Sequence, residues 1–505
     1  MAECSCRITT HGERQLEVNA IYPLDPADPR TAYRVDLYLF FPYQLGVTEK
    51  TYGVSRFLAD LRTYTRHTPP AIPLARLVDP ACEASPLTRI AAKLKSMDLA
   101  GRLDDRAVLY EIQSFANIFH VQARDTWRLL RSQLRHGTPA DAIAGPLKAL
   151  FDEMAEALDR FRALFPSLIA PGVPESLRQA YHLADEAVSL NAEKTGCRCY
   201  QLTREYPGLE PLRAFILQRI TAESAHRARM GYATVVSPSD EVKNETVVYR
   251  TGMVKKWAES CMYMNRKPAR LLDNLAQILL GMAAGAAMLF AVVATIIATR
   301  WFAINSLPWV MIIVVSYIFK DRIKEILRAA LLRRLPRLVA DQVEDLIDPR
   351  IHRRVGRSRA RVHFTREDRL PSGLRAIRDI EGNAFHNILP PEDVIHFQKD
   401  ITLDSPRLYA VHTRLDSITE ILRLRVDSWL AGMDDPTSAL YCVEHGEPQE
   451  VQARRVYHVN MIVGFTRPGA QGARYFRHRL VLNRQGIVRI EQLETSTSAA
   501  SAHRP

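Results

Sequence analysis

The chain of 505 residues predicts two or three folding units. Its formal net charge of +12 comes mainly from arginines, many of which flank one central segment, so the charge alone does not indicate a nucleic-acid partner. The 7 cysteines are scattered and odd in number, which excludes a disulfide framework and indicates free thiols in a reducing cytosol.

The N-terminal residues 1–50 are predicted to begin as a β-hairpin region. The segment from Met1 to Arg7 contains neither a basic n-region nor an apolar stretch, so we expect no cleavable signal peptide. Apolar and polar residues then alternate over 15–22 and again over 33–41. This period of two is typical of strands with one buried face, and the intervening Pro/Asp-rich loop favours an antiparallel pair.

Residues 51–265 are predicted to form a cytosolic helical bundle. Apolar residues recur three and four positions apart over 109–134 and 147–165, and further amphipathic stretches cover 175–195 and 209–230. Short glycine and proline breaks separate these segments. Long amphipathic helices joined by short connections indicate an antiparallel bundle.

Residues 274–319 are predicted to form a two-helix transmembrane hairpin. No charged residue occurs over 274–299, and after Arg300 none occurs over 301–319. The first run makes a helix of about 39 Å, which exceeds the hydrocarbon core of about 30 Å. A soluble core helix rarely stays uncharged on every face for that length, so we expect an integral membrane protein.

The two arms of the predicted hairpin are unequal. Pro308 suits a first helical turn, and a helix from there has only about 18 Å before Lys320. Full spanning then requires a start near Trp301 with a proline kink, or a locally thinned bilayer with Lys320 snorkelling to the interface. A shallow re-entrant hairpin is the alternative, and both paths return the chain to the same side.

Basic residues on both flanks set the orientation of the hairpin. They precede it and follow it as Lys255, Lys256, Arg266, Lys267, Arg270, Lys320, Arg322, Lys324, Arg328, Arg333, Arg334 and Arg337. Positive charge is retained on the cytoplasmic side of a membrane. We therefore expect a bacterial inner-membrane protein with both termini in the cytoplasm and the Arg300 turn outside.

The first arm carries Gly281 and Gly285, four residues apart. Small residues at this spacing let two helices approach closely. Two interpretations stay open, because the groove can pack against the second arm of the same chain or against a second copy.

The remainder of the chain is predicted to continue on the cytoplasmic side. Residues 320–347 extend the second arm as a basic juxtamembrane helix, bent at Pro336. Residues 350–493 form an α+β domain, and the low-complexity tail 494–505 is predicted to be disordered. Within the domain we expect a strand at 360–364, helices at 391–400 and 415–431, and an antiparallel meander from 439 onward.

Signature motifs of catalysis do not occur in the sequence, which has no phosphate-binding loop and no zincin, hydrolase or kinase pattern. The pairs Cys4/Cys6 and Cys197/Cys199 are more closely spaced than the cysteines of structural zinc sites. We therefore expect free thiols there and no metal.

The nearest polar constellation consists of His386, Glu392 and His396. If a helix begins after Pro391, Glu392 and His396 lie one turn apart and His386 approaches from the preceding loop. Two imidazoles and a carboxylate can hold a divalent metal or act as an acid/base pair. We favour a simpler interpretation, in which acidic residues cap the positive end of a helix, because no defined ligand motif accompanies them.

A dense basic run follows the juxtamembrane segment, and its arginines are Arg350, Arg353, Arg354, Arg357, Arg359 and Arg361. Such a patch suits the phosphates of lipid or nucleic acid. Glu367 and Asp368 interrupt its continuation, and no aromatic ladder accompanies it. We interpret it as a basic loop or edge strand that faces water or the acids of the bundle.

These observations predict an α+β membrane protein with a mostly helical cytosolic N-terminal region, a central transmembrane hairpin and a C-terminal mixed domain. The leading hypothesis is a two-pass, membrane-tethered interaction or regulatory module, because two cytosolic domains share a minimal anchor without polar residues that would line a path. We expect the lipid bilayer, a cytosolic protein and a second copy of the chain as partners, and neither a cofactor nor nucleic acid. The alternative is a membrane-bound metal-dependent or acid/base enzyme with its site in the C-terminal domain.

Overall fold

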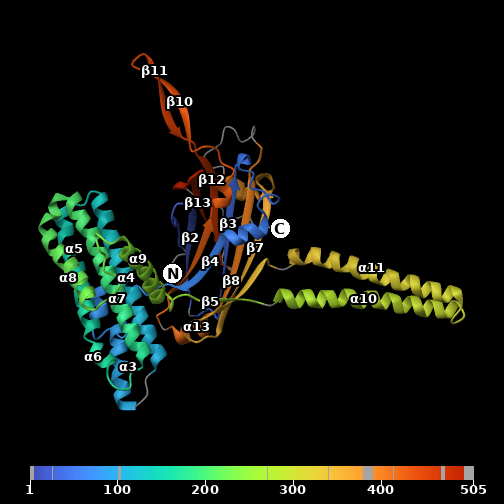
Figure 1. The fold of residues 1–505 in the computed structure, drawn as a ribbon, viewed down its shortest axis with the longest axis horizontal. Coiled ribbons are helices and arrows are strands. Elements are labelled where there is room, and N and C mark those ends of the chain that lie inside the picture. Colours follow the sequence, from blue (N-terminus) through green and yellow to red (C-terminus); the bar gives the residue numbers. More distant parts are fainter. Residues whose placement is uncertain are drawn as a thin grey trace.

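The computed structural model describes residues 5–25, 27–100, 104–269, 271–338, 340–378, 390–412, 414–467 and 473–493. They form three parts, which Figure 1 shows spread along the longest axis. A helical bundle lies at one end, a β-sandwich in the middle and a long helical hairpin at the other end. Strands from both ends of the sequence build the sandwich, so the bundle and the hairpin are insertions into one β-domain.

Two antiparallel sheets enclose the apolar core of the sandwich. The smaller sheet has the order β1-β2-β9-β4, the larger has the order β14-β13-β12-β3-β8-β7-β6-β5, and β10 and β11 form a separate ribbon. The bounds are β1 Ser5–Thr10, β2 Gln15–Pro23, β3 Arg30–Phe41, β4 Leu61–His67, β5 Asn265–Pro268, β6 Gln342–Ile347, β7 Arg354–Arg366, β8 Asp393–Asp404, β9 Ser417–Arg425, β10 Thr437–Glu444, β11 Glu447–Arg454, β12 Tyr457–Thr466, β13 Arg474–Asn483 and β14 Gly486–Leu493.

The two N-terminal period-two runs are strands, as predicted, but they do not pair with each other. β2 lies between β1 and β9 in the smaller sheet, and β3 lies between β12 and β8 in the larger one. The connection therefore crosses from one sheet to the other, and Tyr22 stacks on Tyr33 with ring centroids 4.5 Å apart. Alternation predicts that each strand has a buried face, but it does not identify the partner strand.

A helical bundle lies within the predicted residues 51–265, but it begins later than residue 51, because β4 belongs to the smaller sheet. Its apolar stripes meet in one cluster that includes Phe115, Phe151 and Phe161. Asp104 and Asp240 cap α4 and α9, because their side chains accept from backbone N–H groups three residues on. The helices are α2 Leu74–Val78, α3 Pro86–Ala100, α4 Asp105–Arg135, α5 Ala140–Arg162, α6 Phe165–Leu168, α7 Glu175–Glu205, α8 Arg213–Arg229 and α9 Glu241–Glu259, and α1 Gly53–Asp60 lies against the sandwich.

The hairpin consists of α10 Leu271–Trp301 and α11 Leu307–Leu338, which pack against each other. Figure 1 shows that it projects away from the sandwich, opposite the bundle. The second arm begins after the turn that contains Asn305, whose φ is 68°, and not near Trp301. Beyond the hairpin, β5 and β6 pair antiparallel, so both of its ends enter one edge of the larger sheet.

Among the described residues, one helix is long and apolar enough to cross a membrane, namely Leu280–Trp301 within α10. The second arm does not meet the same standard, because Lys320 and the charges that follow it shorten its apolar run. The predicted basic juxtamembrane helix also ends earlier than 347, since α11 stops at Leu338 and β6 begins at Gln342.

Two elements of the C-terminal domain differ from the prediction. Residues 391–400 and 415–431 were expected to be helical, but they hold β8 and β9, and only the short α14 Asp427–Leu430 is helical there. Lys399 occupies an inward position of β8 and forms a buried ion pair with Glu420 of β9, so a charge interrupts the apolar alternation. The strand at 360–364 and the antiparallel meander are confirmed as β7 and β12–β14. The remaining helices are α12 Ser372–Arg378 and α13 Ser405–Val411.

Candidate functional site

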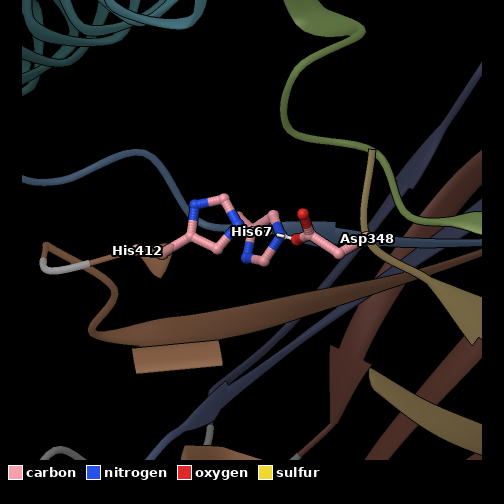
Figure 2. Close-up of side chains that lie close together, drawn as sticks. All are labelled: His67, Asp348 and His412. Carbon is pink, nitrogen blue, oxygen red and sulfur yellow. Dashed lines mark hydrogen bonds and ion pairs between the residues drawn. The ribbon is translucent and has the colours of Figure 1, made fainter. Parts of the chain in front are cut away.

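A buried cluster of His67, Asp348 and His412 lies where the sandwich meets the bundle. His67 is the last residue of β4, Asp348 follows β6, and His412 follows α13. Figure 2 shows the two imidazole rings and the carboxylate converging from these three segments. Their ligand atoms all lie within 4.8 Å of one another, and no other group of three potential metal ligands meets this test in the described part of the chain.

The Asp348 carboxylate holds the cluster together. Its Oδ2 atom lies 2.6 Å from Nε2 of His412 and 3.1 Å from Nε2 of His67. Its Oδ1 atom accepts from the backbone N–H groups of Arg350 and Ile351, at 2.9 and 3.3 Å. The backbone N–H groups therefore hold the carboxylate in place, and both Nε2 atoms contact its Oδ2 atom.

The outer nitrogens of the two imidazoles differ. Nδ1 of His412 lies 3.1 Å from the hydroxyl of Tyr110, which belongs to α4 of the bundle. Nδ1 of His67 is buried and has no hydrogen-bond partner among the described residues. Hydrogen bonds to the outer nitrogen orient histidine ligands in metal sites, so Tyr110 is placed to orient His412.

Burial and hydrogen bonding shift the pKa values of two of these groups. Burial alone would raise the pKa of Asp348, but the hydrogen bonds from His412 and His67 lower it far below its usual range. Burial lowers the pKa of His67, and the hydrogen bond to Asp348 opposes this shift only in part. The cluster thus favours an ionised carboxylate and a neutral His67 imidazole, which are the forms that bind metals.

A narrow pocket opens beside the cluster. It has a volume of about 20 Å³ and is lined by His67, His412, Tyr110 and Arg350 among others, which is room for about one water molecule or ion. The guanidinium of Arg350 lies 5.0 Å from the centre of the Tyr110 ring and donates to the Val411 carbonyl at 2.6 Å. Arg350 and Tyr110 therefore border the space next to the two imidazoles.

The cluster has two chemical uses. Two imidazoles and one carboxylate are a donor set for Zn²⁺ or Fe²⁺, with remaining positions left for water or a ligand. Without a metal, the same three groups form a hydrogen-bonded chain that can pass a proton between two imidazoles.

The residues proposed from the sequence lie elsewhere. His386 lies outside the described residues. Glu392 precedes β8, and its two carboxylate oxygens accept hydrogen bonds from Nε and Nη2 of Arg378 at 2.9 and 3.0 Å. His396 in β8 bonds to Asp36 at 2.8 Å. The prediction of a helix that joins Glu392 and His396 is wrong, because His396 lies in a strand. Four residues of extended chain span about 13 Å, so the two side chains are not one helical turn apart.

Of the basic run, Arg354, Arg357, Arg359 and Arg361 lie in β7, whereas Arg350 and Arg353 precede it. The prediction of a loop or an edge strand is wrong for these four, because β7 has β6 on one side and β8 on the other. Arg354 and Arg357 pair with Asp345 of β6 at 3.7 and 2.9 Å. Arg350 alone of the six predicted patch arginines lines the narrow pocket. The other members of the run, Arg353, Arg359 and Arg361, do not line it.

Gly281 and Gly285 lie on a face of α10 that no other described element covers. A Cβ atom built on either would meet no heavy atom of the described chain within 4 Å outside its own helix. By contrast, Ala283, Ala287 and Ala298 are buried on the same helix, which identifies the face towards α11. The glycine groove therefore does not serve the second arm in this structure.

Sequence reasoning missed His67, Asp348 and His412 because no local motif joins them. The positions of His67 and Asp348 differ by 281 in the sequence, and those of Asp348 and His412 differ by 64. Only the pairing of β5 with β6 and the placement of β4 and α13 bring them together. Comparison of the chain with protein-family models, curated proteins and solved structures gives no match to any of them.

Proposed function

We propose that this protein is a two-pass integral inner-membrane protein that acts as a membrane-tethered interaction or regulatory module. One observation carries the proposal, namely the apolar surface that the hairpin leaves uncovered. Met282, Leu289 and Ile296 of α10 are 62%, 65% and 62% exposed. Apolar surface in water costs about 25 cal/mol per Å², so a bilayer is the surrounding that suits this helix.

The charges around the hairpin support a cytoplasmic position for both the bundle and the sandwich. Basic residues flank both arms, whereas the turn has Arg300 alone. The bundle is joined to the sandwich by the Tyr110–His412 contact and by Arg414, which donates to Glu111 at 2.6 Å. The hairpin would thus hold the bundle and the sandwich at the cytoplasmic side of the membrane, where a protein partner can bind them.

Alkaline carbonate extraction of membranes tests the anchor. We expect the full chain to stay in the membrane pellet, because a helix embedded in lipid is not released by high pH. Peripheral proteins that bind through charge are released under the same conditions. Release of the full chain into the supernatant would contradict the proposal.

A second candidate function is metal-dependent or acid/base chemistry, and the convergence of His67, Asp348 and His412 favours it. The site differs from the one expected in the C-terminal domain, because β4 and α4 contribute His67 and Tyr110 to it. The neutral imidazole and ionised carboxylate match the needs of a divalent transition metal.

Metal analysis of the purified full chain in detergent tests this candidate. We expect about one Zn²⁺ or Fe²⁺ per chain after loading and dialysis, and loss of that metal in His412→Ala and Asp348→Asn. His396→Ala is the matched control, because His396 also pairs with an aspartate but lies on the outer face of the sandwich. Equal metal content in all of these variants would rule the site out.

A further inference from the structure

A second concentration of charged side chains lies where the bundle meets β1. An open groove of about 700 Å³ is lined by the last turns of α4, by α7 and by β1. Its cationic lining comes from Arg7, Arg128, Arg131, Arg135 and Arg198, with Trp127 among them. The 18 residues that separate Tyr110 from Arg128 along α4 make about 27 Å of helix, so this groove is separate from the His67 cluster.

The fold brings these arginines together from three elements. Arg128, Arg131 and Arg135 lie three and four residues apart, so they share one face of α4 over about 10 Å of helix. Arg198 comes from α7, which packs against α4, and Arg7 comes from the edge strand β1. The guanidinium groups of Arg131 and Arg198 lie 5.4 and 5.2 Å from the centre of the Trp127 ring.

No described carboxylate lines the groove. Arg128 lies 3.7 Å from Asp125 outside it. Arg7, Arg131, Arg135 and Arg198 form no ion pair with any residue in the described ranges, whereas Arg162 and Arg250 of the bundle pair with Asp185, Glu223 and Glu186. Surface arginines that converge without acids repel one another, and an anion between them would remove that repulsion.

The surplus positive potential affects nearby groups. The pKa of Arg128 is lowered by burial and then by neighbouring arginines, among them Arg124 and Arg7. The pKa of Lys194 on α7 is lowered by burial and then by Arg198. Both shifts have the direction that an uncompensated cluster of cations produces.

We propose that this groove binds a multiply phosphorylated small molecule, of the class of nucleoside or inorganic polyphosphates. Guanidinium forks match phosphate oxygens in pairs. The three arginines of α4 extend over about 10 Å of helix, which exceeds the reach of a single phosphate. Several linked phosphates therefore suit the groove better.

Two other polyanions fit the groove less well. Figure 1 shows the hairpin and the bundle on opposite sides of the sandwich, so the headgroups of a bilayer around the hairpin would not reach the bundle. Single-stranded nucleic acid usually stacks its bases on free aromatic rings. Trp127 is the one tryptophan that lines the groove, and the guanidinium groups of Arg131 and Arg198 already lie near its ring.

Calorimetric titration of the full chain in detergent micelles tests the proposal, with sodium triphosphate, ATP and orthophosphate as probes. We expect binding of triphosphate that weakens with added salt, and much weaker binding of orthophosphate. Selective binding of ATP over triphosphate would identify a nucleoside polyphosphate, and equal binding would identify the phosphates alone as the recognised group.

The double variant Arg131→Gln/Arg135→Gln should weaken triphosphate binding by about tenfold or more, because two charge-assisted contacts are lost. Arg160→Gln is the matched control, since Arg160 is an exposed arginine of α5 outside the groove. Circular dichroism and thermal unfolding of both variants establish that they fold. The proposal is overturned by absence of triphosphate binding, by equal weakening in the control, or by binding of a 20-nucleotide RNA alone.

Discussion

Helices α4 and α10 are equally long, with 31 residues each, but their apolar side chains have opposite surroundings. In α4, Phe115 and Phe119 are fully buried by neighbouring helices, and even the polar Asn117 is buried and hydrogen bonded. In α10, Leu289 and Phe290 remain 65% and 40% exposed. Helix formation therefore does not distinguish the two segments. What distinguishes them is whether the chain itself supplies a cover for the apolar surface.

This difference assigns separate roles to the two ends of the molecule. The bundle encloses an apolar core of its own, although Val242 and Tyr249 of α9 stay 74% and 70% exposed. The hairpin covers only the alanine face of α10 with α11 and requires another apolar surrounding for the rest. The sandwich between them receives the ends of both insertions and places the His67 cluster next to the bundle.

The largest expected effect comes from removing the same side chain in both helices. Phe115→Ala should destabilise the bundle by about 3–5 kcal/mol, because the cavity it leaves lies in a filled core. Phe290→Ala should change the unfolding temperature in detergent little, since no core surrounds Phe290. Thermal unfolding followed by far-UV circular dichroism measures both. A large loss for Phe290→Ala would mean that α10 is a core helix.

A charge placed on equally exposed leucines of both helices should have a somewhat smaller effect. Leu289 in α10 and Leu129 in α4 are 65% and 58% exposed. Leu289→Asp should reduce membrane insertion, because an aspartate at the centre of a spanning helix costs about 2.5–3.5 kcal/mol, whereas Leu129→Asp should be neutral. The measurement is the yield of each variant in the membrane fraction. Equal yields would indicate that α10 faces water.

Acidification should weaken the bundle before it affects the hairpin. Burial, and then the nearby charges of Arg124 and Lys255, lower the pKa of His120 in α4 to about 4, and its Nδ1 lies 2.9 Å from Oδ1 of Asn191. The unfolded value is about 6.5. The folded state therefore resists protonation, so this stabilisation is complete above about pH 6.5 and is lost as the pH falls towards 4.

The expected loss between pH 7.5 and pH 5 is about 1–2 kcal/mol. His120→Gln should reduce the dependence of the unfolding temperature on pH in this range. The hairpin helices α10 and α11 contain no histidine and should not contribute. An unchanged pH dependence in His120→Gln would remove His120 as the cause.

The smallest effect is expected from the ribbon formed by β10 and β11. Like the hairpin, it projects from the sandwich, as Figure 1 shows, and Tyr441 and Val443 are exposed on it. Because few of its side chains pack on the body, replacement of residues 438–453 by a short Gly/Ser linker should change the free energy of unfolding by about 0.5 kcal/mol or less. A larger loss would indicate that the ribbon stabilises the sandwich.

The sequence predicts the bundle well because its helices carry complete 3–4 stripes, as around Phe115 and Phe161, and end at glycine or proline. It predicts β8 poorly, because the inward Lys399 finds its partner Glu420 on another sheet. Residues 418–424 of β9 were also misread, since both faces of that strand are buried and no alternation remains. β2 pairs with β9, which lies between 394 and 410 positions away in the sequence, and no local pattern encodes that partner.

The same limit explains the candidate sites. Arg128, Arg131 and Arg135 share a visible helical spacing, but their convergence with Arg7 follows from the tertiary fold. His67 and His412 were not recognised as a pair, because a histidine near the end of a strand or a helix has no distinctive neighbours in sequence. A pattern predicts which face of an element a residue occupies, whereas a site requires that the faces of separate elements meet.

The most direct measurement of the central claim is labelling of Ala303→Cys by a membrane-impermeant maleimide in spheroplasts. Ala303 lies in the turn between α10 and α11, whereas Cys197 of the bundle and Cys442 of the ribbon are exposed native thiols. The account predicts that the introduced cysteine reacts in intact spheroplasts, while Cys197 and Cys442 react only after lysis. Protection of the Ala303 position until lysis would contradict a hairpin that crosses the membrane.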